Sequence, residues 1–275
     1  MIWHAGRGSA LALGPARNIK LAGLSPNSLL PFCTYPENLM ALPLNTSDNP
    51  NDPATVARYH MVQQQIRPWN VSDEAVLELL QQVPREDFTP TAYRGMAFMD
   101  MEIPLLGTTE QALKKGHCML APKIDARLLQ ELLVQPGERV LEIGTGSGYL
   151  AALLGGLTQH VVSLEIEPLL VEMARENLQR AGIHHVEVRH ADGSQEGAAE
   201  GPFDAIVLSG SVAEIPQHLL AQLRDGGRLV TIVGYEPMMR TTVVRRQGNQ
   251  FTTTQPWDTV APRLQGFAEP SRFQF

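Results

Sequence analysis

The sequence has few cysteines, no long apolar run and no excess of basic residues. Its two cysteines in 275 residues, Cys33 and Cys118, lie far apart and outside any Cys-x-x-Cys or Cys/His zinc spacing. This favours a reduced, cytoplasmic protein without a disulfide framework. No apolar run approaches the roughly 20 residues that span a bilayer. The 22 Lys and Arg residues against 29 Asp and Glu give a formal charge of −7, so neither nucleic acid nor a membrane is expected as a partner.

Residues 1–53 lack a sustained apolar period. Seven prolines interrupt them, at positions 15, 26, 31, 36, 43, 50 and 53, so no continuous apolar face can offset the entropy of ordering. We therefore predict a disordered N-terminal extension over 1–53. A signal peptide is the alternative, because Arg7 precedes an apolar stretch at 10–13, but Gly14 and Pro15 end that stretch too early.

Residues 54–275 are expected to form the folded domain, with a helical or lid segment over 54–135 and an α/β core over 136–275. Apolar residues at helical spacing predict a helix over 55–66, and Ser72 is the expected N-cap of a second helix with acids in its first turn. Residues 92–116 show little regularity. Their apolar side chains are interpreted mainly as core, with a lid over a ligand as the alternative.

From residue 124 onward, short apolar strands alternate with amphipathic helices. The predicted helices are 124–134, 150–157, 168–181 and 216–223, and the predicted strands are 140–143, 161–165, 186–190, 203–208 and 229–233. This order indicates an α/β, doubly wound fold with a mostly parallel sheet covered on both faces. Residues 241–246 and 251–254 flank Gly248 and predict an antiparallel hairpin at the C-terminal edge, which Val260 and Leu264 should finish.

The segment 139–149 has the pattern of a buried strand, a glycine-rich turn and the start of a helix. Gly144, Gly146 and Gly148 permit positive φ and a close approach of a ligand to the backbone, and the helix start offers free N–H groups. A dinucleotide fingerprint would have its third glycine at the position of Tyr149. The E-x-G-x-G-x-G pattern that begins at Glu142 instead resembles S-adenosylmethionine (SAM) methyltransferases, although a purely structural turn is the alternative.

Two further strand ends carry carboxylates. Glu165 ends the second predicted strand, 19 positions after Gly146, where a carboxylate can accept both hydroxyls of a ribose. Asp192 and Gly193 end the third, where they can receive an adenine ring and its amine. The alternatives are a solvated acid at a helix start and an ordinary Asp-Gly turn. Together with the glycine-rich turn, the three consecutive strand ends predict one extended ligand.

Histidines cluster at positions 184, 185 and 190. No carboxylate or cysteine completes a ligand set, so we interpret them as polar residues of strand-flanking loops and predict no metal site.

Several segments together resemble the protein-L-isoaspartate O-methyltransferase family: 62–88 (which ends in Val-Pro-Arg-Glu-Asp-Phe), 140–149, 192–193, 202–207, 214–217 and 222–230. The resemblance extends from about Thr55 to Leu264. It implies a Rossmann-like SAM-dependent fold with an N-terminal helical segment and an altered C-terminal edge. It also implies methylation of isoaspartyl carboxylates in damaged proteins, with cofactor contacts from Glu142, Gly144, Thr145, Gly146, Ser147, Gly148, Glu165, Asp192 and Gly193. The resemblance does not indicate an oligomeric state.

The sequence departs from the family where the acceptor should bind. The family's Gln-Thr-Ile-Ser-Gln-Pro run corresponds here to residues that end at Pro122, which puts Leu120 at the serine, and the family's usual Thr-Ala-Ala is Ser209-Gly210-Ser211. The catalytic residues therefore stay unknown. Substitutes for the lost hydroxyl could be Thr108, Thr109, His117 or Cys118, although we interpret Cys118 first as a small buried hydrophobe.

An ionised acceptor carboxylate needs no general base, so alignment could suffice for the reaction. The rewritten segment leaves two alternatives open: a methyltransferase of this fold with another acceptor, and a SAM-binding protein without catalysis.

Overall fold

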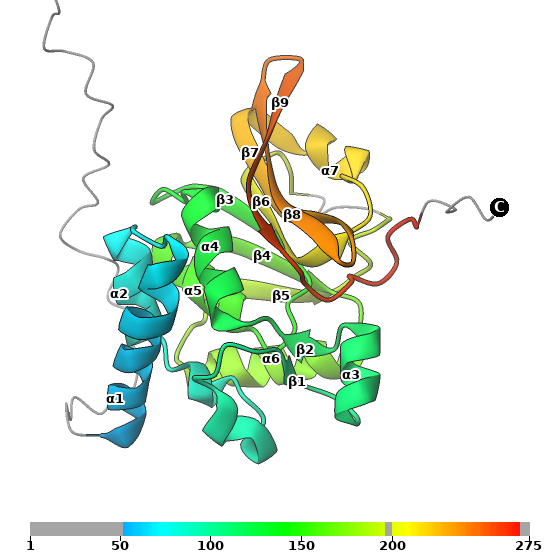
Figure 1. Cartoon of the computed structure of the whole chain (residues 1–275). Helices are drawn as coiled ribbons and strands as arrows, with labels where there is room; N and C mark the ends of the chain where they lie inside the picture. The colour runs from blue at the N-terminus through cyan, green and yellow to red at the C-terminus, as the bar shows by residue number, and fades with distance from the viewer. Residues whose placement is uncertain (1–51, 196–199, 270–275) are drawn as a thin grey trace, which may run out of the picture. The chain divides into compact units, whose positions relative to one another are not determined.

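A computed structural model describes residues 52–195 and 200–269 (Figure 1). The predicted disordered stretch 1–53 lies outside these residues except for its last two positions, Asp52 and Pro53. Asp52 caps the first helix, its side chain accepting a hydrogen bond from the Thr55 amide at 3.0 Å. Within the described ranges, no helix has the length and apolarity needed to cross a bilayer.

The N-terminal segment is helical, as predicted. Its elements are α1 (Pro53–His60), η1 (Met61–Ile66), η2 (Arg67–Trp69), α2 (Glu74–Gln82), η3 (Arg85–Asp87), η4 (Thr91–Met96), α3 (Thr109–Lys115) and α4 (Pro122–Leu132), with the short strands β1 (Ile103–Pro104) and β2 (Cys118–Met119) paired antiparallel. The expected N-cap at Ser72 is wrong. Asp73 caps α2 instead, because its carboxylate accepts hydrogen bonds from the amides of Ala75 and Val76.

Residues 92–116 are more regular than the sequence suggested. They hold η4, β1 and α3, and α3 begins with a capping box between Thr108 and Gln111. These elements are too short to show an apolar period. Ile103 and Leu105 are buried in the main core whereas Met99 is 51% exposed, so the core interpretation holds for part of this stretch.

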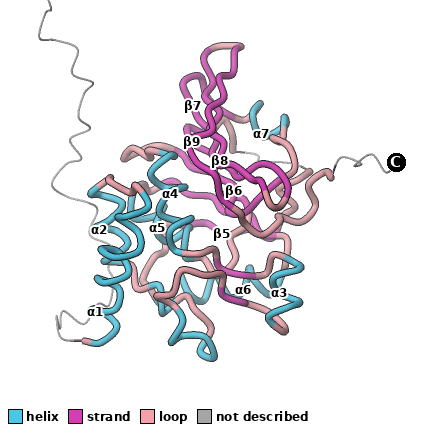
Figure 2. The backbone as a smooth tube through the Cα atoms, in the orientation of Figure 1, coloured by secondary structure: helices cyan, strands magenta, loops and turns pink. Residues whose placement is uncertain are grey.

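A seven-stranded sheet forms the centre, in the order β5-β4-β3-β6-β7-β8-β9 (Figures 1 and 2). Its strands are β3 (Arg139–Ile143), β4 (His160–Glu165), β5 (Val186–His190), β6 (Phe203–Val212), β7 (Leu223–Tyr235), β8 (Met238–Gln247) and β9 (Gln250–Thr259). The first five in spatial order run parallel, and β8 and β9 add the antiparallel edge. The predicted fold class is confirmed, although the edge hairpin is longer than expected.

Helices α5 (Tyr149–Leu157), α6 (Pro168–Arg180) and α7 (Gln217–Ala221) connect the strands. Successive strand residues face opposite sides of the sheet. Val140 and Ala205 join the cluster that contains the N-terminal helices, α5 and α6, and Leu141 and Ile206 join the cluster that contains α7. The N-terminal helices thus share one core with the sheet.

Arg85 fixes the chain that leads into α4. Its side chain is fully buried, and its three nitrogens donate to the Asp125 carboxylate at 2.8 Å, the Leu120 carbonyl at 2.6 Å and the Ala97 carbonyl at 3.0 Å. A buried guanidinium whose three nitrogens are all hydrogen-bonded holds its acceptors in one geometry. The position of Leu120, one wall of the site described below, is therefore set by Arg85.

Candidate active site

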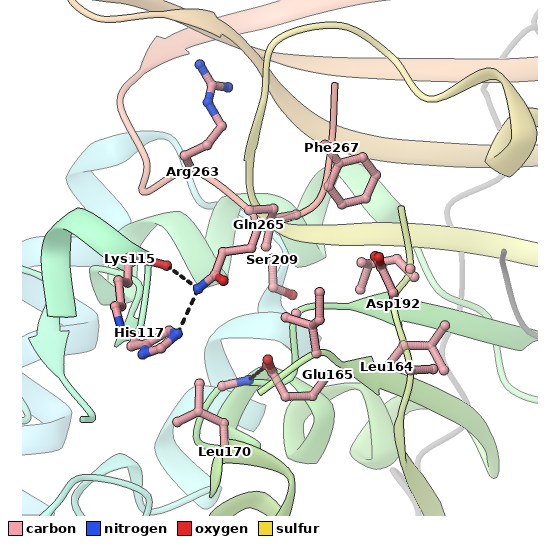
Figure 3. Close-up of a pocket in the computed structure, with 18 of the residues that line it drawn as sticks. Lys115, His117, Leu164, Glu165, Leu170, Asp192, Ser209, Arg263, Gln265 and Phe267 are labelled. Atoms are coloured by element: carbon pink, nitrogen blue, oxygen red, sulfur yellow. Dashed lines mark hydrogen bonds between the residues drawn. The ribbon is translucent and has the colours of Figure 1, made fainter. Parts of the chain in front are cut away.

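The strand order reverses between β3 and β6, because β4 follows β3 on one side and β6 lies on the other. Ligands of doubly wound sheets bind at this point, beside the carboxyl ends of the strands. A cavity lies there, with about 530 Å³ of free space up to its open mouth (Figure 3). Gly144 and Gly146 after β3, Glu165 at the end of β4, Asp192 after β5 and Ser209 in β6 line it.

The three glycines of the turn do different things. Gly144 (φ +92°) leaves room for Leu264, whose Cδ2 would lie 2.7 Å from an added Cβ. Gly146 (φ +55°) presents its backbone to the cavity. Gly148 (φ +86°) begins α5 and packs on Ala174 of α6, 3.2 Å from where a Cβ would stand, and it lines neither this cavity nor the second one described below.

Glu165 is held in place by backbone amides. One carboxylate oxygen accepts from the Gly146 N–H at 2.9 Å (Figure 3), and the other accepts from the Glu167 N–H at 3.0 Å. The residue is 6% exposed and faces the cavity. Because an ionised carboxylate has about four acceptor positions, Glu165 can bind a further donor in the cavity without giving up these two bonds.

Asp192 and Gly193 form a turn and also line the cavity. The Asp192 carboxylate accepts from the Ser194 amide at 2.9 Å, as an Asp-Gly turn would. Gly193 lies so close to Ile143 that an added Cβ would be 2.6 Å from its Cγ2. Both residues line the same cavity as Gly146 and Glu165, so the structure brings the three strand ends together.

A second cavity of about 290 Å³ lies behind the glycine-rich turn. It shares Cys118, Gly144, Gly146 and Ser209 with the first. Its other walls are Met119, Leu120, Asp125, Glu142, Thr145, Ser147, Tyr149 and Leu150. Glu142, Thr145 and Ser147 thus line this cavity and not the first one.

Glu142 is completely buried and hydrogen-bonded on both oxygens. One oxygen lies 2.5 Å from the Ser163 hydroxyl and the other 2.8 Å from the Ser209 hydroxyl, and Thr145 joins the chain through a 2.5 Å contact with Ser163. Burial raises the pKa of Glu142 from 4.5 to about 8, against the smaller lowering effect of the two serines. At neutral pH this carboxyl is mostly protonated.

The sequence model of the Protein-L-isoaspartate(D-aspartate) O-methyltransferase family matches residues 57–261. The chain belongs to this family. A protein-L-isoaspartate O-methyltransferase of Methanoculleus marisnigri is 41% identical over 198 residues, which cover 72% of this chain and 86% of that protein. One of Cronobacter sakazakii is 40% identical over 187 residues, covering 68% and 86%.

Solved structures agree in fold. A Plasmodium falciparum protein-L-isoaspartate O-methyltransferase in complex with S-adenosyl-L-homocysteine has a TM-score of 0.62 at 21% identity, covering 75% of this chain and 98% of that one. Another protein-L-isoaspartate O-methyltransferase has a TM-score of 0.64 at 24% identity and covers 77% and 66%. The resemblance found in the sequence is confirmed, and this chain is a SAM-dependent methyltransferase of that family.

The segment that departs from the family pattern contributes apolar side chains to the wall of the second cavity. Leu120 is 5% exposed and packs in the main core, and it lines the second cavity. Burial, with a smaller contribution from the charge of Glu102, raises the pKa of the Cys118 thiol to about 12, which keeps it protonated and a poor nucleophile. Thr108 caps α3, and neither Thr108 nor Thr109 lines the two cavities.

The C-terminal segment 261–267 contributes a wall that the sequence did not reveal. Leu264 was expected to finish the sheet edge. Instead the chain leaves the edge, the Leu264 amide donates to the Ser211 carbonyl, and the side chain packs over Gly144 and Gly210. Gln265 reaches across the cavity to the Lys115 carbonyl at 2.8 Å and His117 Nε2 at 2.7 Å (Figure 3). No apolar period marks this stretch, so only the fold could place it.

The clustered histidines include two with structural partners. His185 contacts the Gly155 carbonyl at 2.8 Å, and His190 contacts the Ile166 carbonyl at 3.1 Å. In the part of the chain that the structure describes, no group of three or more His, Cys, Asp or Glu residues could hold a metal ion.

Proposed function

We propose that this family member transfers the methyl group of SAM to the carboxylate of isoaspartyl residues in damaged proteins. The observation that supports this best is the pair of adjacent cavities, which share the lining residues Gly144, Gly146, Cys118 and Ser209. One cavity has a volume suited to a small-molecule cofactor. The other offers a separate space for an acceptor beside it. The names of relatives at about 40% identity point to the same substrate.

We assign the cofactor to the first cavity. The glycine-rich turn would take its amino-acid end, with the backbone of Gly144 and Gly146 close by. Glu165 would accept the ribose hydroxyls, and Asp192 with Gly193 would take the adenine. These roles agree with the position of the three strand ends around one space and with the absence of side chains at Gly144 and Gly146.

When bound, the sulfonium cofactor supplies an activated methyl group, and the protein's task is alignment. The acceptor carboxylate is ionised at neutral pH and needs no general base. The buried walls of the second cavity, including Leu120 and Leu150, exclude water from the acceptor. A fixed acceptor in a dry space is sufficient for an in-line displacement.

We also propose the cytoplasm as the compartment. The buried, unpaired Cys118 fits a reducing environment, and isoaspartyl-containing proteins are the partners that this function requires.

The experiment uses purified protein, radiolabelled SAM, an isoaspartyl peptide and its normal aspartyl twin. Label on the isoaspartyl peptide alone supports the proposal. Label on neither peptide, with SAM binding seen by calorimetry, would instead favour a different acceptor or a non-catalytic SAM-binding protein, the two alternatives that the apolar side chain of Leu120 suggests. Failure to bind SAM would overturn the cofactor assignment.

A further inference from the structure

The second cavity contains few polar groups free to hold a charged acceptor. Asp125 is bound by Arg85, Thr145 is bound to Ser163, and the Cys118 thiol stays protonated. The Tyr149 ring is packed between the Arg85 guanidinium, 4.8 Å from the ring centre, and Phe88, and its hydroxyl is buried without a hydrogen-bond partner among the described residues. Among the side chains that line this cavity, that of Ser209 alone is partly exposed.

Ser209 also stands where the two cavities meet, since it lines both. Its backbone lies beside the glycine-rich turn, with the Ser209 carbonyl oxygen 3.7 Å from the position of a Cβ on Gly144. The labelled Ser209 side chain projects into the space between Gln265 and Glu165 (Figure 3). A hydroxyl at this place can reach an acceptor that approaches the cofactor from the second cavity.

We propose that the Ser209 hydroxyl, held from behind by Glu142, donates a hydrogen bond to the acceptor carboxylate and so positions it for methyl transfer. This inference rests on the proposed function. It supplies the positioning that the apolar side chain of Leu120, in the wall of the same cavity, cannot provide.

The buried chain behind Ser209 can orient that hydroxyl. In the structure Ser163 and Ser209 each donate to one oxygen of Glu142, and Thr145 contacts Ser163. Because burial keeps Glu142 mostly protonated at neutral pH, its proton can be donated to Ser209 instead, which leaves the Ser209 hydrogen free to point into the cavity. Once Glu142 ionises, Ser209 must donate to Glu142 instead. The carboxylate of the substrate then loses the hydrogen bond from Ser209 and lies near the negative charge of ionised Glu142.

The charged groups around Glu142 come from two neighbouring elements. Asp125 on α4 and Glu165 on β4 both raise the pKa of Glu142, after the larger effect of burial. Asp125 is itself paired with Arg85. The alkaline loss of peptide binding should therefore follow Glu142, with a midpoint near pH 8.

The test compares wild type, Ser209→Ala, Ser209→Thr and the double variant Ser209→Ala/Leu120→Ser, with an end-capped isoaspartyl peptide as acceptor. We expect Ser209→Ala to raise the peptide KM by about 10- to 100-fold, the value of a hydrogen bond to a charged group, with the SAM Kd unchanged. Ser209→Thr keeps the hydroxyl and should stay near wild type. Leu120→Ser should recover part of the loss by restoring a hydroxyl to the same cavity.

A second measurement follows kcat/KM for the peptide between pH 6 and 9.5. Wild type should lose activity above about pH 8, and Glu142→Gln should not, because its amide donates to Ser209 at every pH. An unchanged peptide KM in Ser209→Ala, or a loss that appears in SAM binding instead, would overturn the inference. If the wild type methylates neither peptide, the proposed function fails first.

Discussion

Replacing Glu142 by Gln should stabilise the protein increasingly as the pH rises. The glutamine side chain has the same shape as that of Glu142 and can keep both serine contacts, its oxygen accepting from Ser163 and its nitrogen donating to Ser209. The substitution removes only the ability to ionise. In the wild type, the carboxyl must lose its proton at high pH inside a completely buried site.

The magnitude follows from the pKa of Glu142, which burial raises from 4.5 to about 8. Because the folded protein binds this proton more tightly than the unfolded chain, its contribution to stability is complete below pH 4.5, falls as the pH rises, and is lost above about pH 8. At about 1.4 kcal/mol for each pH unit, the full difference is about 5 kcal/mol. The free energy of unfolding of Glu142→Gln, relative to wild type, should rise by about that amount between pH 4.5 and 8.5.

Urea denaturation followed by circular dichroism at half-unit pH steps measures this difference directly. Subtracting the wild-type curve removes all other titrating groups, since they are common to both proteins. Ser163→Thr, which keeps the hydroxyl contact with Glu142, serves as a control and should parallel the wild type. A difference curve that stays flat across this range would show that Glu142 is ionised in the folded protein, and the reasoning about the buried hydrogen-bond chain would be refuted.

Three further outcomes follow from the same geometry. Gly146→Val should abolish SAM binding measured by calorimetry, because valine is strained at φ +55° and its branched side chain would enter the cavity; an unchanged Kd would remove the cofactor assignment. Glu165→Ala should raise the SAM Kd by about tenfold or more, because the ribose hydroxyls lose a charged hydrogen-bond acceptor. Retained affinity would show that Glu165 only fixes the Gly146 backbone through its hydrogen bond. Arg85→Met should lower the free energy of unfolding by about 3–5 kcal/mol by stranding buried Asp125. The double variant Arg85→Met/Asp125→Leu should recover part of that loss. Equal destabilisation in the single and double variants would show that the unpaired Asp125 carboxylate is not the cause.

Local patterns predicted the strands around the first cavity well. The strand alternation located β3, β4 and β5 within a residue of their bounds, and parallel strands necessarily bring their carboxyl ends to one edge. Glu165 and Asp192 could therefore be placed together from their positions in the sequence alone. The length of the edge hairpin was underestimated, because exposed β9 carries a run of threonine, glutamine and aromatic residues without clear alternation.

Some contacts around the two cavities could not be predicted, because they join residues far apart in the chain. Ser209 reaches Glu142 across 67 positions, and Gln265 reaches Lys115 across 150. Neither pairing leaves a local apolar or polar period. Leu264 was predicted to end an edge strand because it is apolar, and only the turn away from β9 showed that it packs over Gly144.

Gly144 illustrates why a glycine pattern alone identifies a backbone path and not a ligand. Its positive φ, the close approach of Leu264 and the neighbouring cavity each require the absence of a side chain. Gly148 satisfies the same pattern yet serves the packing of α5 on α6. Discrimination between ligands must therefore come from the groups at the other strand ends, and discrimination between acceptors from the second cavity. In this chain that cavity keeps a hydroxyl at Ser209 while Leu120 presents only carbon, which shifts the positioning of the acceptor from the N-terminal segment to the sheet.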